Sequence, residues 1–371
     1  FLLTGQNQSL PVQADSGLQV TRPISTPWHW LSFPRLQRTG NNPVEAIPVL
    51  EDIDPIPDNL YFHSNEGGYF QYIERSSGWW QPTSFNEITS TKGYKQNILD
   101  EGTFTHTMYG TDLNPNTPVL LYVSQNGNPE NWIGYFLHQP LMPEEAFQGV
   151  WEYLTQIKSQ YWTMTKVMVN GKPVWLRPSN VGPIRYGDAL VVKVSDDCTL
   201  YWNQSGEPAG ENQRAAPEDF DYTEYADYQP WYLGTDSLQG AMEIGLMAGG
   251  GCIGAATLQP GDTLLGVNAY TQAVPPGTPV TIAVWDGLKS TSTITDKYYV
   301  ISPETNSRQY RTVHTGEGQP YYYISLTGGQ AQDTLTHQPA YLTGIRPNPC
   351  TAAAVIGFNM AKAAHACIEI T

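Results

Sequence analysis

An internal duplication constrains this chain more than any other feature of its sequence. Two tryptophan-rich stretches repeat one order of motifs with an offset of about 100 residues, the first beginning WHWLSFPRL and the second NWIGYFLHQPL. The aligned positions are Trp30, Leu31 and Phe33 with Trp132, Ile133 and Tyr135, residues 45–47 with 145–147, and the Trp79–Trp80 region with Trp175. Because repeated supersecondary units pack on each other, residues 28–99 and 128–194 are expected to superpose as two copies around a shared core.

Each copy predicts the order strand, helix, strands. In the second copy, Pro143 and the two glutamates after it suit the first turn of a helix. The apolar positions that follow fall on one helical face, and they are Phe147, Val150, Trp151, Leu154, Ile157 and Tyr161. Such a stripe is more typical of a core helix on a sheet than of a ligand groove. The first copy's helix is expected to be shorter, because Pro48 removes a donor inside it.

The rest of the chain predicts a linker and then strands. Residues 203–230 carry seven acids against one arginine, which indicates a solvated tether between domains. Short alternating segments with turn residues between them then indicate a β-sandwich. The expected fold class is mainly β with minor α, a duplicated Trp-rich α+β unit followed by β-sandwich modules. The expected domains are an extended arm at 1–24, the duplicated domain at 25–202, the acidic linker at 203–230, the sandwich at 231–340 and a partial hairpin at 341–371.

Composition excludes several classes of partner. The net charge of -16 repels phosphate backbones and anionic lipids, so we expect no nucleic acid. No apolar run reaches about 18 residues, so we expect no membrane insertion. Four cysteines are too few for a disulfide framework, and the pairing of Cys198, Cys252, Cys350 and Cys367 stays open. Because the chain begins at Phe1 without Met, we expect a processed protein or a piece of a longer one.

No motif indicates catalysis, and no cofactor or metal is expected. Residues 249–254 satisfy the glycine pattern of dinucleotide sites, but the residues after them read as a strand and a turn, so a hairpin turn is predicted. The seven histidines are scattered, and no nucleophile motif is present. Two alternatives stay open. Carboxylates from distant segments could meet as in glycosidases, and the loop at 52–59 could hold calcium, although it lacks the usual glycine and bidentate glutamate.

Aromatic residues are the remaining candidates for a binding role. Eleven Trp and 23 Tyr exceed what a core of this size needs, so some are expected on the surface. Exposed aromatic rings serve sugar stacking and protein contacts, and the low charge favours protein contacts. The candidate assembly or ligand contacts are Leu2, Leu3, Leu10 and Val12 in the arm, together with Trp79 and Trp80.

The C-terminal sequence resembles a known sorting signal. The segment IRPNPCTAAAVIGFNMAKAAHACIEIT resembles the start of the C-terminal sorting domain of proteins exported by the bacterial type IX system, through residues 347–349, Thr351, 355–358 and 368–370. WHWLSFPRL with GYKQNI, and MEIGLMAGGGCIGAATL with VTIAVWDG, resemble regions of large surface proteins from the same Bacteroidota-type bacteria. The resemblance implies strands near 355–358 and 366–370 and an extracellular or outer-surface location, and it carries over no catalytic motif.

The sequence therefore predicts a non-catalytic extracellular structural or adhesive surface protein that assembles with itself into a filament or sheath. The arm would add a strand to an open edge on the next chain, a head-to-tail contact. Alternatively, both ends dock on their own subunit or continue into further domains. Glycans and other surface proteins are further candidate partners. The alternative function is a C-terminal accessory or glycan-binding region of a secreted hydrolase.

Overall fold

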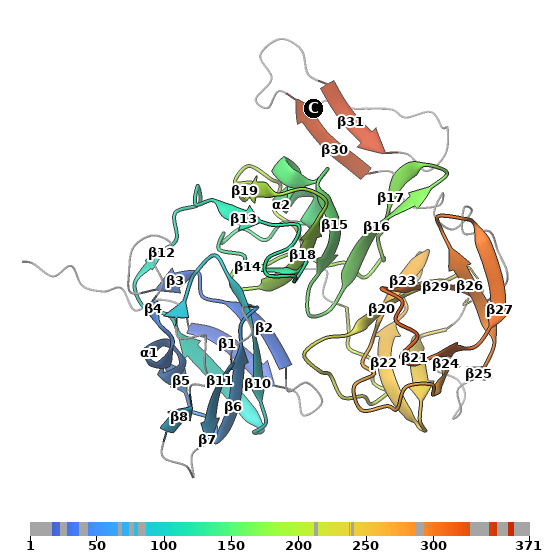
Figure 1. Ribbon diagram of the computed structural model, residues 1–371, viewed down its shortest axis with the longest axis horizontal. Helices are drawn as coiled ribbons and strands as arrows, with labels where there is room; N and C mark the ends of the chain where they lie inside the picture. The colour runs from blue at the N-terminus through green and yellow to red at the C-terminus, as the bar shows by residue number, and fades with distance from the viewer. Residues whose placement is uncertain are drawn as a thin grey trace, which may run out of the picture.

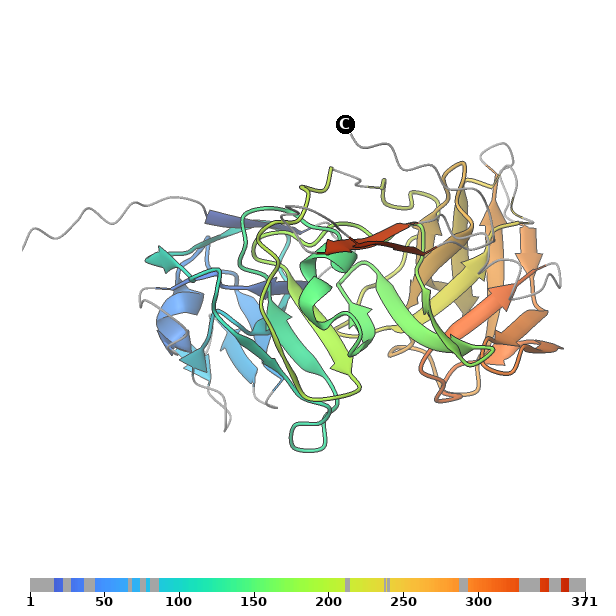
Figure 2. The ribbon, with the colours of Figure 1, turned by 90° about the horizontal axis from the view of Figure 1, so that it is seen from above.

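The computed structural model describes residues 17–22, 28–36, 44–65, 69–73, 78–80, 87–210, 214–236, 238, 241–286, 293–326, 341–346 and 355–359. The described chain is mainly β with two short α-helices, which confirms the predicted fold class at that level. Figures 1 and 2 show three bodies in a row, with the first copy of the repeat at one end, the second copy in the middle and the C-terminal sheets at the other end.

The first copy is built on a five-stranded antiparallel sheet. Its strands lie in the spatial order β2 (Trp28–Ser32), β10 (Gly93–Ile98), β6 (Asn59–His63), β7 (Tyr69–Ile73) and β8 (Gly78–Trp80). Helix α1 (Ala46–Glu51) follows the first strand and buries Ala46 and Leu50. Three small ladders flank the sheet: β1 (Gly17–Arg22), β11 (Gly102–Thr107) and β5 (Ile53–Asp54); β12 (Thr111–Asp112) with β3 (Arg35–Leu36); and β4 (Val44–Glu45) with β9 (Glu87–Ile88).

The second copy repeats this topology. Its sheet has the spatial order β14 (Asn131–Gly134), β18 (Ala189–Val194), β15 (Leu154–Lys158), β16 (Thr163–Val169) and β17 (Lys172–Leu176), with a small ladder of β13 (Val119–Leu121) and β19 (Cys198–Leu200) beside it. In both sheets the last strand lies next to the first, and a short helix follows the first strand. Ser32 pairs with Gly93 as Gly134 pairs with Ala189, so the ladder registers make Ser32 and Gly134 equivalent.

The two copies meet through reciprocal contacts. The N–H of Ser32 donates to the carbonyl of Gly187 at 2.7 Å, and the N–H of Gly134 donates to the carbonyl of Thr91 at 3.0 Å. Two isolated bridges exchange partners in the same way, Leu31 with Asp188 and Ile133 with Lys92. Each copy thus offers its first strand and the turn before its last strand to the other. Such a self-complementary contact is the pattern of a two-fold dimer, here within one chain.

The expectation of a shared core is wrong. Buried apolar side chains form one cluster in the first copy, which includes Phe33, Leu50 and Phe62. A separate and larger cluster in the second copy includes Tyr135 and Trp202. The copies touch through their first strands and the turns before their last strands, and only a smaller apolar cluster joins Trp30 of the first copy to Ala189 and Val191 of the second.

The predicted helix of the second copy is mostly wrong. Helix α2 (Pro143–Ala146) is followed by a single 3₁₀ turn, η2 (Gln148–Val150), and the chain then enters β15. The apolar stripe from Phe147 to Tyr161 matched a helical period, but β15 gains ladder bonds on both sides, to β16 and β18. Such long-range pairing overrides local propensity.

The first copy's helix is the longer of the two, contrary to expectation. Helix α1 has six residues and α2 has four. Pro48 is the third residue of α1, and the N–H groups of the first turn have no acceptor within the helix. A proline at that position therefore costs no helical hydrogen bond.

The seam between the copies leaves no room for a side chain at Gly134. A Cβ at this position would lie 2.6 Å from Ser32 Cβ and 2.9 Å from the carbonyl oxygen of Lys92. We expect Gly134→Ala to lower the free energy of unfolding by about 1 to 3 kcal/mol, since overpacking forces the backbone to shift. Gly149→Ala is the control, because a Cβ there meets nothing within 4 Å. Equal denaturant midpoints for the two variants would contradict the close packing of the two copies at Gly134.

The C-terminal body consists of two sheets that share one core. The first sheet has the order β23 (Leu264–Ala269), β20 (Gln229–Gly234), β29 (Tyr322–Ser325), β26 (Tyr298–Ser302) and β27 (Ser307–Arg311). The second has the order β22 (Gly251–Thr257), β21 (Glu243–Ala248), β24 (Pro279–Trp285) and β25 (Thr293–Thr295), and β28 (Val313–His314) also pairs with β24. The core contains Trp231 and Ile324 from one sheet and Leu246 and Ile282 from the other.

The glycine pattern at 249–254 forms a hairpin turn, as predicted. Strands β21 and β22 pair antiparallel on either side of Gly249 and Gly250. Both glycines have positive φ, 62° and 88°, which a two-residue hairpin turn of type I′ requires and which glycine adopts without strain. The pattern therefore opens no helix at which a nucleotide pyrophosphate would bind.

The N-terminal arm is partly docked on its own chain. Strand β1 pairs antiparallel with β11 over six residues, from Gly17 with Thr107 to Arg22 with Gly102. Residues 17–22 of the arm therefore dock on their own chain, as the alternative expectation had it for this part of the arm, and not on a neighbouring chain. A strand was predicted near residues 355–358, and β31 (Val355–Asn359) lies there, paired with β30 (Tyr341–Arg346). The second strand predicted near 366–370 lies outside the described residues.

Candidate functional site

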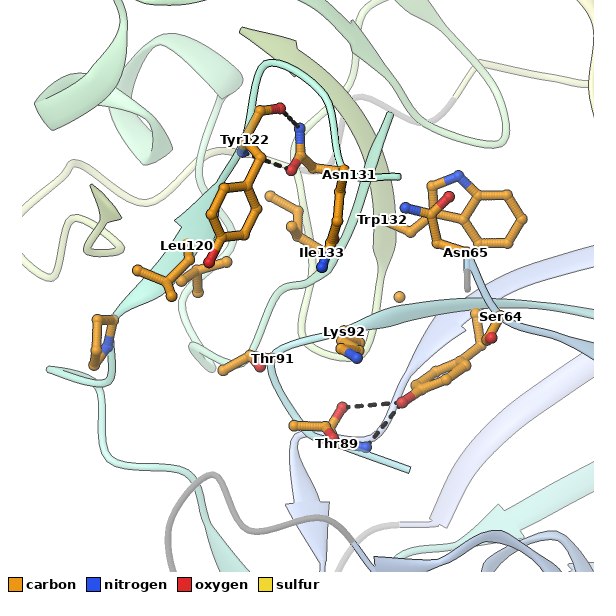
Figure 3. Close-up of a pocket in the computed structure, with 15 residues that line it drawn as sticks. Ser64, Asn65, Thr89, Thr91, Lys92, Leu120, Tyr122, Asn131, Trp132 and Ile133 are labelled. Carbon is orange, nitrogen blue, oxygen red and sulfur yellow. Dashed lines mark hydrogen bonds between the residues drawn. The ribbon is translucent and has the colours of Figure 1, made fainter. Parts of the chain in front are cut away.

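A first pocket, of about 350 Å³, lies at the seam between the two copies (Figure 3). Tyr122 and Asn131 exchange two hydrogen bonds on one side of it, at 2.8 and 2.9 Å. On the other side the N–H of Thr89 donates to the hydroxyl of Tyr94 at 2.8 Å. Of the residues that line this pocket, Lys92 alone carries a charge. Several of its polar groups thus satisfy each other, and the pocket mainly reflects how the copies pack.

A second pocket, of about 630 Å³, lies where both copies, the linker and the C-terminal sheets meet. Four distant parts of the chain build its wall. Its lining residues include His29 and Trp30 from β2, residues 159–162 from the turn between β15 and β16, Arg185 and Asp188 from the loop before β18, Glu218, Asp221, Tyr222 and Glu224 from the linker, and Ala255 and Ala256 from β22.

Gln160 fixes the orientation of Glu224 in this second pocket. The side-chain oxygen of Gln160 accepts from the backbone N–H of Trp30 at 2.9 Å, so its Nε2 must be the donor on the other side. That Nε2 donates to the carbonyl of Trp28 at 2.7 Å and to Oε2 of Glu224 at 3.2 Å. Because Oε2 of Glu224 is occupied as an acceptor, a proton on this carboxyl belongs on Oε1.

Two carboxyl groups of the second pocket titrate near neutral pH. Burial raises the pKa of Glu224 to about 7, and the hydrogen bond from Gln160 offsets only part of this effect. Burial also raises the pKa of Asp188 to about 6, although the Arg185 N–H donates to its Oδ2 at 2.7 Å and the Arg185 charge favours ionisation. Glu224 is 5% exposed and forms no ion pair with any described residue. It is therefore the least compensated acid of the pocket.

Lys95 fastens the linker to both copies beside this pocket. Its Nζ donates to the carbonyl of Ala226 at 2.8 Å. The same atom lies 3.8 Å from the centre of the Trp30 ring and 4.4 Å from that of Trp132, the equivalent residue of the second copy. Burial lowers the pKa of Lys95 to about 8. The ammonium is held between two aromatic faces, a favourable cation–π arrangement.

The acidic linker is not a solvated tether in its second half. Phe220 and Tyr228 are buried, at 8% and 5% exposure, and the Lys158 ammonium forms an ion pair with Asp227. The aromatic residues at every second or third position of this run supply the apolar surface that packs it against the rest of the chain. A solvated tether was expected for residues 203–230 from their charge alone, without regard to the regular spacing of their aromatic residues.

The expected contact residues are not brought together in the described part. Leu2, Leu3, Leu10 and Val12 lie outside the described residues. Trp79 and Trp80 belong to the edge strand β8, whose backbone alone is described; Trp79 pairs with Tyr72 as Trp175 pairs with Lys166. Surface tryptophans were expected, but every described tryptophan side chain is buried or half-buried. The exposed aromatic side chains among the described residues are Tyr153, Tyr161, Tyr201 and Tyr310.

Sequence reasoning missed Gln160, Asp188 and Glu224. No motif links them, although the open alternative of distant carboxylates sharing one site allowed for such a group. Within the described residues, no three metal-ligating side chains gather as a metal site would require. No described helix has the length and apolar character needed to cross a membrane. Comparisons with protein families, curated proteins and solved structures found no match to this chain.

Proposed function

We propose that the chain is a non-catalytic subunit of an extracellular or outer-surface assembly. The observation that carries the proposal is the β30–β31 hairpin, because each of its strands pairs only with the other within the described residues. An isolated two-stranded hairpin is marginal in water, and its open edges accept further strands. A strand from a neighbouring chain would complete it by β-addition. The sorting-like sequence around this hairpin supports a secreted, cell-attached or released protein.

The packing between bodies also suits a structural subunit. A cluster that includes Val167 and Leu176 of the second copy with Tyr232 and Ile301 of the C-terminal body joins those two parts. A second cluster joins Trp30 of the first copy to the linker and the C-terminal body. Apolar contacts at every junction favour a single rigid block over a string of independent domains.

Deleting residues 1–16 tests the assembly. The deletion removes Leu2, Leu3, Leu10 and Val12 but leaves β1 on β11, so the folded body should stay intact. We expect light scattering and electron microscopy to show that the full chain forms particles of several subunits. The particles of the shortened chain should contain at least one subunit fewer. The control is a chain with the same 16 residues in shuffled order, which should also lose the large particles. If the shortened chain keeps the assembly state of the full chain, strand exchange by this arm is ruled out.

The second candidate function is glycan binding, as part of a secreted hydrolase or alone. The second pocket favours it, because aromatic rings and carboxyl groups line one cavity. Strand β8, which carries Trp79 and Trp80, is an edge strand of its sheet. Glycan-array binding that is lost on replacing Trp79 and Trp80 by Ala would place sugars on that edge.

A further inference from the structure

The second pocket has the size and walls of a small-molecule site. Its volume of about 630 Å³ lies within the range of roughly 300 to 1,000 Å³ that is common for ligand sites. Tyr161 is 67% exposed and Tyr222 is half-buried, so both contribute accessible ring surface to the wall. Ring faces of this kind attract cations as well as apolar groups.

Acids exceed available cations in the lining. Arg214 is held by both carboxylate oxygens of Asp262, at 2.6 Å each, which leaves Arg185 as the cation not held in such a pair. Opposite these two arginines stand four carboxyl groups, those of Asp188, Glu218, Asp221 and Glu224. The pocket therefore carries an excess of negative charge once these acids ionise.

Among the acids that line the second pocket, Glu224 is buried and has no counter-ion within the described residues. The ionisable groups whose titration it influences are the phenols of Tyr161, Tyr222, Tyr228 and Tyr270. Phenols are neutral at pH 7, so these neighbours supply no positive charge. Gln160 occupies Oε2 of Glu224 and leaves Oε1 for another partner. A carboxylate buried in this way costs free energy until a cation compensates it.

We propose that the second pocket binds a small aliphatic ammonium ion of the diamine class, with Glu224 as the carboxylate that receives its charge. The ammonium supplies the counter-charge that the described chain does not provide, and the tyrosine rings cover its methylene groups. A saccharide would use the same walls and its hydroxyl groups would donate hydrogen bonds to the Glu224 carboxylate, but it would bring no positive charge to compensate the buried negative charge. The charge of the site therefore favours the amine. This inference does not depend on the proposed assembly role.

Calorimetry with a matched pair of probes tests the proposal. We expect 1,4-diaminobutane to bind the full chain at pH 7.5, and expect 1,4-butanediol and maltose, which carry no charge, to bind at least tenfold more weakly. Glu224→Gln keeps the shape of the side chain and should weaken diamine binding at least tenfold. Glu101→Gln, an exposed acid outside the pocket, should leave the affinity unchanged.

Proton release provides the second readout. Because the ammonium favours ionised Glu224, binding at pH 6.5 should release protons, seen as a binding enthalpy that changes with the ionisation enthalpy of the buffer. The Glu224→Gln variant should release fewer. The proposal is overturned if 1,4-diaminobutane fails to bind at millimolar concentration, if maltose or the diol binds as well as the diamine, or if Glu224→Gln binds the diamine like the full chain.

Discussion

Trp30→Ala should lower the free energy of unfolding by about 3 to 5 kcal/mol, the usual cost of removing a large buried aromatic side chain. Trp30 is 7% exposed, and it stacks on Tyr228 of the linker with ring centres 6.0 Å apart. The Lys95 ammonium lies 3.8 Å from the centre of its ring, and Ala189 and Val191 of the second copy belong to the same buried cluster. The substitution therefore loosens the first copy, the linker and the buried lysine together.

Trp132→Ala is the matched variant, because Trp132 is the equivalent residue of the second copy. A cost of about 3 to 5 kcal/mol applies to a buried tryptophan, but Trp132 is only half-buried. Its indole N–H donates to Glu130 at 3.2 Å, and Lys95 lies 4.4 Å from its ring. We expect Trp132→Ala to cost roughly half as much as Trp30→Ala, since less area is buried. If chemical denaturation gave equal losses in the free energy of unfolding for both variants, the position in the repeat, and not the contact with the linker, would determine the loss.

The repeat and the strand positions could be predicted because they depend on local patterns. Trp30 and Trp132 occupy equivalent ladder positions, opposite Lys95 and Val191. The alternating segments after the linker form paired strands such as β21, β23 and β24. The spacing of apolar residues depends on which face of an element is buried, so it can be recognised in the sequence.

The helix of the second copy could not be predicted from the same periodicity. Residues 154–158 are apolar at spacings that suit a helix as well as a buried strand, and short apolar runs do not distinguish the two. Residues 154–158 form a strand because β16 and β18 pair with them on either side. That information lies in segments up to about 40 residues away.

The second pocket could not be predicted, because the residues that contact one another in it are even further apart in the sequence. Trp30 donates its N–H to Gln160, which lies 130 residues further along the chain, and Glu224 joins from 64 residues beyond Gln160. Glutamine and glutamate are ordinary surface residues in sequence terms. Only the packing of three bodies removes them from water and gives the carboxyl its altered pKa.

Glu224→Gln should raise the free energy of unfolding at pH 8 by up to about 3.5 kcal/mol, and this gain should vanish near pH 4.5. The folded chain holds the pKa of Glu224 at about 7, against an ordinary value of 4.5. Between those values the folded state binds more protons than the unfolded state, so stability falls as pH rises through this window. Well above pH 7 Glu224 is ionised in both states, and the loss of stability is complete. The difference of about 2.5 between the two pKa values, at about 1.4 kcal/mol for each pKa unit, gives the size of this loss.

The amide in Glu224→Gln is neutral at every pH, and its oxygen can still accept the hydrogen bond from Gln160. The variant should therefore show a flatter dependence of the denaturant midpoint on pH between 4.5 and 8 than the native chain. Some slope of the same sign should remain, because Asp188 also has a raised pKa, about 6. Glu101→Gln, which replaces an exposed acid, should retain the full native slope. If the Glu224→Gln and Glu101→Gln variants lose stability in parallel from pH 5 to 8, Glu224 is not the uncompensated acid of the second pocket, because a buried carboxylate without a counter-ion must weaken the fold as it ionises.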